Sequence, residues 1–142
     1  MRYLLSMSFI FLLSCSSTKK TAEAKKPAAT ANLKGTSWTL SAVPNFKMET
    51  LKSPAMLHFN DTALTINGYS GCNGFGGNYT VDGNKLKMSN IMGTMKACMP
   101  GMKTESSMYN ALNNSDNYKI SNGKLILMQG DKMLAEFTPL KK

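Results

Sequence analysis

Apolar and polar residues alternate in short runs from residue 33 onward, and turn residues separate the runs. Alternation with a period of two is typical of β-strands that bury one face. Trp38 and Leu40 are therefore expected on one face of the first strand, and Leu64 and Ile66 on one face of the third. The predicted strands are 33–43, 55–60, 63–67, 75–81, 85–91, 117–121, 125–129 and 133–139.

Two dipeptides between these runs predict tight hairpins. Asp82-Gly83 and Asn122-Gly123 each separate two predicted strands. The favoured two-residue hairpin turn needs positive φ at both central positions, which Asn, Asp and Gly tolerate best. Each dipeptide is therefore expected to join two adjacent antiparallel strands.

One segment breaks the strand pattern. Met108, Ala111 and Leu112 recur at helical spacing within residues 102–113, and Asn-Asn-Ser follows the segment. Many short strands with one amphipathic helix predict a mainly β (α+β) fold. We expect a small antiparallel domain that curls into an open β-barrel-like form, with the helix covering an end or face.

The N-terminus has a different pattern. Arg2 precedes an apolar run from Leu4 to Leu13, which is too short to span a bilayer and has the shape of a secretory signal. The tetrad 12–15 (LLSC) resembles the lipobox of bacterial lipoproteins, which implies cleavage before Cys15 and lipidation of its thiol. Two or three acyl chains would hold the protein on a membrane almost permanently. The alternative is an ordinary signal peptide followed by an unmodified cysteine.

Residues 16–32 contain no aromatic or large aliphatic side chain and are expected to form a flexible tether. The predicted organisation is a signal peptide (1–14), a lipidated cysteine with its tether (15–32) and one domain (33–142). Ser16 after the cysteine is compatible with outer-membrane sorting. We therefore expect a location in the cell envelope, on the outer membrane facing the periplasm.

Positive charge is spread along the chain. With the signal removed, the tether carries +3 (4 Lys minus 1 Glu) and the domain +5 (12 Lys minus 7 acids). No arginine then remains for bidentate phosphate contacts, and the lysines form no stripe interleaved with aromatics. The composition argues against nucleic acid as a partner and favours a membrane surface or an anionic polymer.

Cysteine parity points to a disulfide. Once Cys15 is assigned to lipid, Cys72 and Cys98 remain, and in an oxidising compartment we expect them to bond. A metal site is the competing interpretation. It is disfavoured because the chain has no CxxC motif and its only histidine, His58, lies far from both cysteines in sequence.

Residues 68–77 are rich in glycine, which suggests either a phosphate cradle or a bent sheet. A phosphate-binding glycine run leads into a helix, whereas this one leads into a predicted strand and lacks GK[ST]. We therefore expect bulges and tight turns. Asn73 is expected to act as a turn residue that bonds the backbone rather than as a ligand group.

Five methionines recur at spacings of four and three: Met88, Met92, Met95, Met99 and Met102. Thioethers are soft ligands, so a Cu(I) site is one interpretation. The run crosses glycines and a proline, so no single helix can present it as a stripe. Core filling or loose surface packing is the favoured interpretation.

No arrangement typical of an enzyme is evident. His58 has neither a serine nucleophile motif beside it nor a second metal ligand in sequence. We therefore predict no catalytic residues, no metal ligands and no cofactor.

The stretches 71–79 (GCNGFGGNY), 94–98 (TMKAC) and 105–112 resemble the META domain family, the HslJ-like heat-shock lipoproteins. The opening GTSWTL and the closing 125–137 also fall at the family's first and last strands, so the resemblance covers residues 33–140. The family-motif positions are Trp38, Gly71, Cys72, Asn73, Gly74, Thr94, Cys98 and Glu105.

The resemblance implies a small barrel-like fold with a helix, an envelope location and, in some members, a link to stress or antibiotic tolerance. It implies no established enzymatic activity. The leading hypothesis is a non-catalytic anchored module that binds another envelope component. The alternatives are a carrier or sensor with a small apolar ligand in the barrel, and Cu(I) or redox handling by the methionines.

Overall fold

The computed structural model describes residues 32–140 and consists of antiparallel strands with one helix. Cys15, the predicted signal peptide and almost all of the tether lie outside the described residues. The elements are β1 (Ser37–Ala42), β2 (Met56–Phe59), β3 (Thr65–Tyr69), β4 (Gly74–Asp82), β5 (Lys85–Gly93), α1 (Met102–Asn114), β6 (Asn117–Ser121), β7 (Lys124–Gln129) and β8 (Lys132–Pro139).

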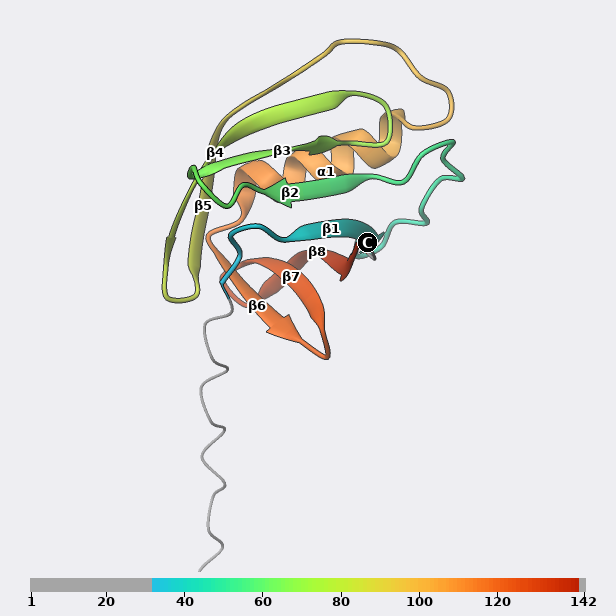
Figure 1. The fold of residues 1–142 in the computed structure, drawn as a ribbon. Coiled ribbons are helices and arrows are strands. Elements are labelled where there is room, and N and C mark those ends of the chain that lie inside the picture. Colours follow the sequence, from blue (N-terminus) through green and yellow to red (C-terminus); the bar gives the residue numbers. More distant parts are fainter. Residues whose placement is uncertain (1–31, 141–142) are drawn as a thin grey trace, which may run out of the picture.

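The strands form a closed ring in sequence order, because each pairs with the next and β8 pairs back with β1 (Figure 1). The seam between β5 and β6 is the weakest join. Its ladder has one register pair, Lys85 with Asn117, flanked by the bonds Leu86 N–H to Asp116 O (3.1 Å) and Tyr118 N–H to Asn84 O (2.9 Å). The predicted antiparallel, barrel-like α+β fold is confirmed.

Helix α1 closes the ring's interior beside this seam. It contacts β5, β7 and β8, and its Met108, Ala111 and Leu112 are fully buried, as the helical spacing predicts. The helix N-terminus has no side-chain cap of its own. Glu49, from the loop between β1 and β2, supplies the acceptor instead: its carboxylate accepts from Thr104 N–H (2.7 Å) and from Gly101 N–H (3.2 Å). These bonds satisfy donors that a helix start leaves free.

Most apolar side chains of the strands are buried and fill the ring. Trp38 and Leu40 are both buried on β1, which confirms the predicted face. Leu64 differs from the prediction: it lies in a bend before β3 and is 47% exposed, whereas Ile66 is buried. The strand begins only at Thr65, so Leu64 has no place in the alternation. The largest fully buried side chains include Phe59, Tyr79, Phe137, Leu57, Leu125 and Leu127.

Both predicted hairpins are present. Asn122 and Gly123 have φ of 52° and 72°, the positive values expected for the turn between β6 and β7. The first hairpin turns one residue later than predicted, because Asp82 still pairs with Lys85 and the turn lies at 83–84. Gly83 there has a φ of 58°, which only glycine adopts freely.

Candidate functional site

The loop Ser70–Asn73 connects β3 to β4 and is folded tightly on itself. Ser70 N–H donates to Asn73 O (2.8 Å), and Gly71 has a φ of 102°. A Cβ on Gly71 would lie 3.0 Å from a Leu51 methyl, so both the conformation and the packing favour glycine there. Asn73 is 2% exposed, and its side chain points into the protein.

The Asn73 amide joins two segments that lie far from it in sequence. Its Oδ1 accepts from Thr94 Oγ1 (2.7 Å) and from Lys96 N–H (2.8 Å). Its Nδ2 donates to Lys96 O (3.0 Å) and to Glu105 Oε1 (3.1 Å). The sequence predicted a local turn role, but the amide bonds the backbone of a residue 23 positions away. Asn73 therefore connects the loop to the chain after β5 and to α1.

Glu105 completes this network from the first turn of α1. Its Oε2 accepts from Asn73 N–H (3.0 Å) and from the hydroxyl of Ser70. Together with the bond from Asn73 Nδ2, the carboxylate accepts three hydrogen bonds from the loop. Buried polar groups that are fully bonded in this way hold one arrangement of the chain. We conclude that Glu105 positions the loop against the helix.

The predicted disulfide forms next to the network. Cys72 and Cys98 are bonded, with 5.5 Å between their Cα atoms. The chains pass closely here, because a Cβ on Gly101 would lie 2.5 Å from Gly71 O. The structural interpretation of the two cysteines is confirmed.

Residues 94–101 form an exposed segment that we call the methionine strap. It arches outward from the end of β5 to the start of α1 (Figure 1). Thr94 and the Lys96 backbone are bonded to Asn73, and Cys98 is bonded to Cys72. Alternate residues are therefore fixed to the body of the domain, and the residues between them face solvent.

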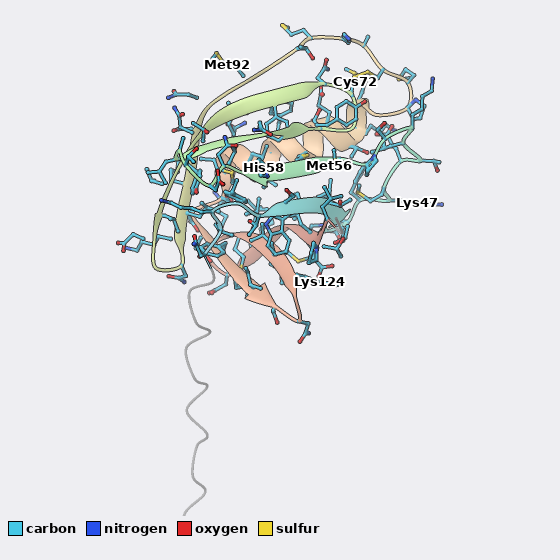
Figure 2. The ribbon with its side chains drawn as sticks, viewed as in Figure 1. Lys47, Met56, His58, Cys72, Met92 and Lys124 are labelled. Atoms are coloured by element: carbon cyan, nitrogen blue, oxygen red, sulfur yellow. A yellow bond between two sulfur atoms is a disulfide. The ribbon has the colours of Figure 1, made fainter. Side chains whose placement is uncertain are left out.

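Those outward positions carry apolar side chains. Met95 is 98% exposed and Met99 is 89% exposed. Met92, just before the strap, is 76% exposed and projects away from the sheet in Figure 2. Met102, just after the strap, is 42% exposed, whereas Met88 is buried in the core. Core filling thus explains Met88, and the other four methionines lie at the surface.

A hollow of about 460 Å³ lies between the strap and α1. Its walls are mostly apolar, and its polar groups include Asn73, Glu105 and Tyr109. Burial raises the pKa of the Tyr109 phenol, and the nearby Glu105 charge adds to the rise. The ring of Tyr109 packs edge-on against Phe75, with 6.0 Å between centroids. The complete lining is Asn73, Gly93, Thr94, Met95, Lys96, Ala97, Met102, Glu105 and Tyr109.

The structure brings together most of the family-motif residues. Gly71, Cys72, Asn73, Gly74, Thr94, Cys98 and Glu105 all lie around this network. Trp38 does not: it lies in the core on β1, where its indole N–H donates to Thr36 Oγ1 (2.8 Å). Cys15 lies outside the described residues.

Sequence reasoning missed three residues that shape the site. Ser70 directly precedes the GCN triplet of the family motif, and this position could have marked it as a site residue. Tyr109 falls on the helix face one turn after Glu105, inside the stretch 105–112 that resembles the family, but it was not singled out as a site residue. Glu49 lies in a loop without periodicity, and no local pattern connects it to the start of α1.

Other candidate chemistry is sparse. His58 Nδ1 lies 2.8 Å from Ser37 Oγ, a cross-strand pair between β1 and β2 that the sequence did not reveal. Within residues 32–140, no group of three or more His, Cys, Asp and Glu side chains is placed to hold a metal ion. The part of the chain that the structure describes has no helix of the length and hydropathy needed to cross a bilayer.

Comparison with known proteins gives a family and a fold. The sequence profile of the META domain matches residues 31–142. The structure is similar to the NMR structure of a protein from Burkholderia xenovorans, with 27% identity, a TM-score of 0.64, and coverage of 78% of this chain and 85% of that one. A second NMR structure is similar in fold, with 18% identity, a TM-score of 0.59, and coverage of 74% of this chain and 89% of that one. No curated protein gives a significant match to the sequence.

Proposed function

The chain belongs to the META domain family, and on that premise we propose that it is a non-catalytic binding module of the cell envelope. In this proposal, lipid at Cys15 holds the domain on the outer membrane, facing the periplasm. The methionine strap binds another envelope component, and this binding contributes to stress or antibiotic tolerance.

The observation that carries the proposal is the way the strap is built. An apolar side chain left in water forgoes roughly 1.5 to 3 kcal/mol of burial free energy. The strap presents Met95 and Met99 almost fully exposed, although a disulfide and the Asn73 network hold it in place. A surface of exposed apolar residues on an ordered segment is typical of an interaction site, and methionine adapts to varied partners.

The shape of the domain supports the proposed arrangement on the membrane. In Figure 1 the blue start of the described chain lies on the lower side of the view, and the strap arches over the upper side. A domain tethered through its N-terminus would thus be free to present the strap away from the membrane that holds it. The Glu105 carboxylate, which lines the hollow, already accepts three hydrogen bonds. That engagement supports a binding role over a catalytic one.

The alternative of an apolar ligand inside the ring has less support. Side chains from the strands and from α1 occupy the interior, and Leu57, Phe59, Met108, Leu125 and Phe137 are all fully buried there. A carrier of this size would need interior space that these side chains fill.

Site-specific crosslinking in living cells tests the binding face. A photoreactive amino acid replaces Met95 in the full chain, and the control replaces Lys119, an exposed residue of β6 on a different element. We expect a discrete crosslinked species from position 95 that is absent at position 119 and falls in yield when the unlabelled chain is over-produced. The same species at both positions, or no species at position 95, would contradict the proposal.

The anchor is tested separately. Mass spectrometry of the protein isolated from membranes should find an acylated cysteine at the mature N-terminus, and Cys15→Ser should release the chain. A deletion strain should then show lowered tolerance to envelope stress that the full chain restores and the Cys15→Ser chain does not. An unacylated N-terminus, or full restoration by the released protein, would count against the anchored role.

A further inference from the structure

We propose that Met95, Met99 and Met102 form a binding site for a soft monovalent metal ion, Cu(I), at the rim of the hollow between the strap and α1. This site does not rest on the proposed envelope partner, because the three thioethers would bind the ion whether or not a protein docks on the strap.

The three methionine side chains are placed so that they can reach one place at the rim of the hollow. Met95 and Met102 both line the hollow, one from the strap and one from the first residue of α1. Met99 lies three residues before Met102, and the chain turns at 99–101 between them. An extended chain of three residues spans at most about 10 Å, and a turn shortens that distance. Long unbranched side chains on these positions can therefore reach a common point.

The side chains are also available. Met95 and Met99 are 98% and 89% exposed, so no packing in the core has to be broken before they bind an ion. Their backbone is fixed nearby, since Lys96 N–H and C=O are both bonded to Asn73 and Cys98 is in the disulfide. Fixing the backbone in advance lowers the conformational entropy lost on binding.

The donor type selects the ion. Thioethers are neutral and soft, which suits Cu(I), whereas Zn²⁺ prefers cysteine thiolate, histidine and carboxylate ligands. Cys98 of the strap is in a disulfide with Cys72, so neither is available as a thiolate. No group of three such harder ligands lies together within residues 32–140. The site is therefore expected to discriminate against Zn²⁺.

The local charges are mixed. The Glu105 carboxylate lines the same hollow and would partly balance the ion's charge. Lys96 also lines the hollow, and Lys103 follows Met102 on α1. Both are solvent-exposed side chains whose repulsion is screened by water and salt. A monovalent ion is tolerated in this surrounding better than a divalent one.

The test is a titration of the folded, oxidised protein with methionine methyl groups labelled with ¹³C. Ag(I) is the first probe, since it is a redox-inert analogue of Cu(I). Cu(I) supplied as its acetonitrile complex without oxygen is the second. We expect saturable shifts of the Met95, Met99 and Met102 methyl signals at one equivalent, and no shift with Zn²⁺. Unchanged signals for these three methyls with both soft ions would overturn the proposal.

Variants locate the site. Met95→Leu and Met99→Leu keep the apolar volume and remove the sulfur, and together they should weaken Ag(I) binding by at least about tenfold. Met133→Leu is the matched control, because this methionine lies on β8, away from the strap. Equal binding by the double variant and the control would overturn the assignment. If the native chain binds Ag(I) but the photoreactive residue at position 95 captures no species in cells, only the proposed partner is refuted. The metal site and the envelope partner can therefore fail independently.

Discussion

Asn73→Asp tests whether the buried amide holds the strap and α1 together. The change keeps the size of the side chain and replaces the Nδ2 donor with a carboxylate oxygen. In the native protein that donor faces Lys96 O at 3.0 Å and Glu105 Oε1 at 3.1 Å. In the variant two acceptors face the introduced carboxylate, and one of them is a carboxylate itself.

The magnitude follows from these distances and from protonation. Two unit charges 3.1 Å apart repel by about 5 kcal/mol at an effective dielectric constant of 20. The introduced acid can avoid this by binding a proton, which at pH 7 costs about 4 kcal/mol relative to an unfolded pKa near 3.9. The protonated acid donates only one hydrogen bond where the amide donates two, which costs about 1 kcal/mol more. Both routes therefore cost about 5 kcal/mol, which is the loss of stability that we expect at pH 7.

The stability penalty of Asn73→Asp changes with pH in the opposite direction to the contribution of an ordinary salt bridge. Because the folded state raises the pKa of the introduced acid, the penalty is largest at neutral pH and shrinks as the pH falls toward about 4. The free energy of unfolding is measured by urea denaturation, followed through the fluorescence of Trp38, the only tryptophan, which is buried. The quantity compared is the difference between variant and native protein at pH 7, 5.5 and 4.

Two controls make the result specific. Asn78→Asp changes an exposed asparagine on β4 and should alter stability by no more than about 0.5 kcal/mol. Adding Glu105→Gln to Asn73→Asp replaces one of the facing carboxylates with an amide donor, so it should restore part of the lost stability at pH 7. A penalty that is equal at pH 7 and pH 4, or that Glu105→Gln fails to reduce, would refute the reasoning.

Three further changes test other parts of the structure. Replacing Cys72 and Cys98 with alanine opens a loop of 26 residues and should lower the free energy of unfolding by about 3.5 kcal/mol in the chain-entropy model, or Tm by about 15 °C; melting within a few degrees of the native protein would contradict this. The hydrogen bond from the Thr104 backbone N–H holds the pKa of Glu49 below its usual value. The ionised Glu49 carboxylate therefore stabilises the fold above an unfolded pKa of about 4.3, and this stabilisation is lost as the pH falls through the folded pKa. Glu49→Gln should therefore lower stability at neutral pH and flatten its decline in acid, and an unchanged acid profile in urea titrations would exclude the capping role. Gly123→Ala places an alanine at a φ of 72° and should lower the free energy of unfolding by about 1 to 2 kcal/mol. Unchanged stability in urea titrations would show that the turn does not have this geometry.

The sequence predicts the parts of the fold that depend on local patterns. The alternation around Trp38 and the spacing of Met108, Ala111 and Leu112 report which face is buried, because period and burial are directly related. Asn122-Gly123 predicts its hairpin because the turn requires positive φ at two adjacent residues. These features need no knowledge of distant parts of the chain.

The site is less predictable because its bonds join distant segments. The resemblance to a family marked Asn73, Thr94 and Glu105, but the hydrogen bonds among them span 21 and 32 residues. No periodicity reports such a bond. The sequence left open whether Met95 fills the core or lies at the surface, because its exposure depends on the disulfide and on the hydrogen bonds to Asn73, which hold alternate residues of the strap to the domain.

Every second residue of the strap is attached to the domain, so the residues that hold the strap in place differ from those that it displays to solvent. Thr94, Lys96 and Cys98 carry the attachments, and Lys96 does so through its backbone alone. Mutations at Met95, Ala97 and Met99 should therefore change the surface that the strap displays without altering the fold that holds it. If the strap binds a partner, such a scaffold can change its specificity without refolding, and it offers three alternate positions for grafting new recognition residues.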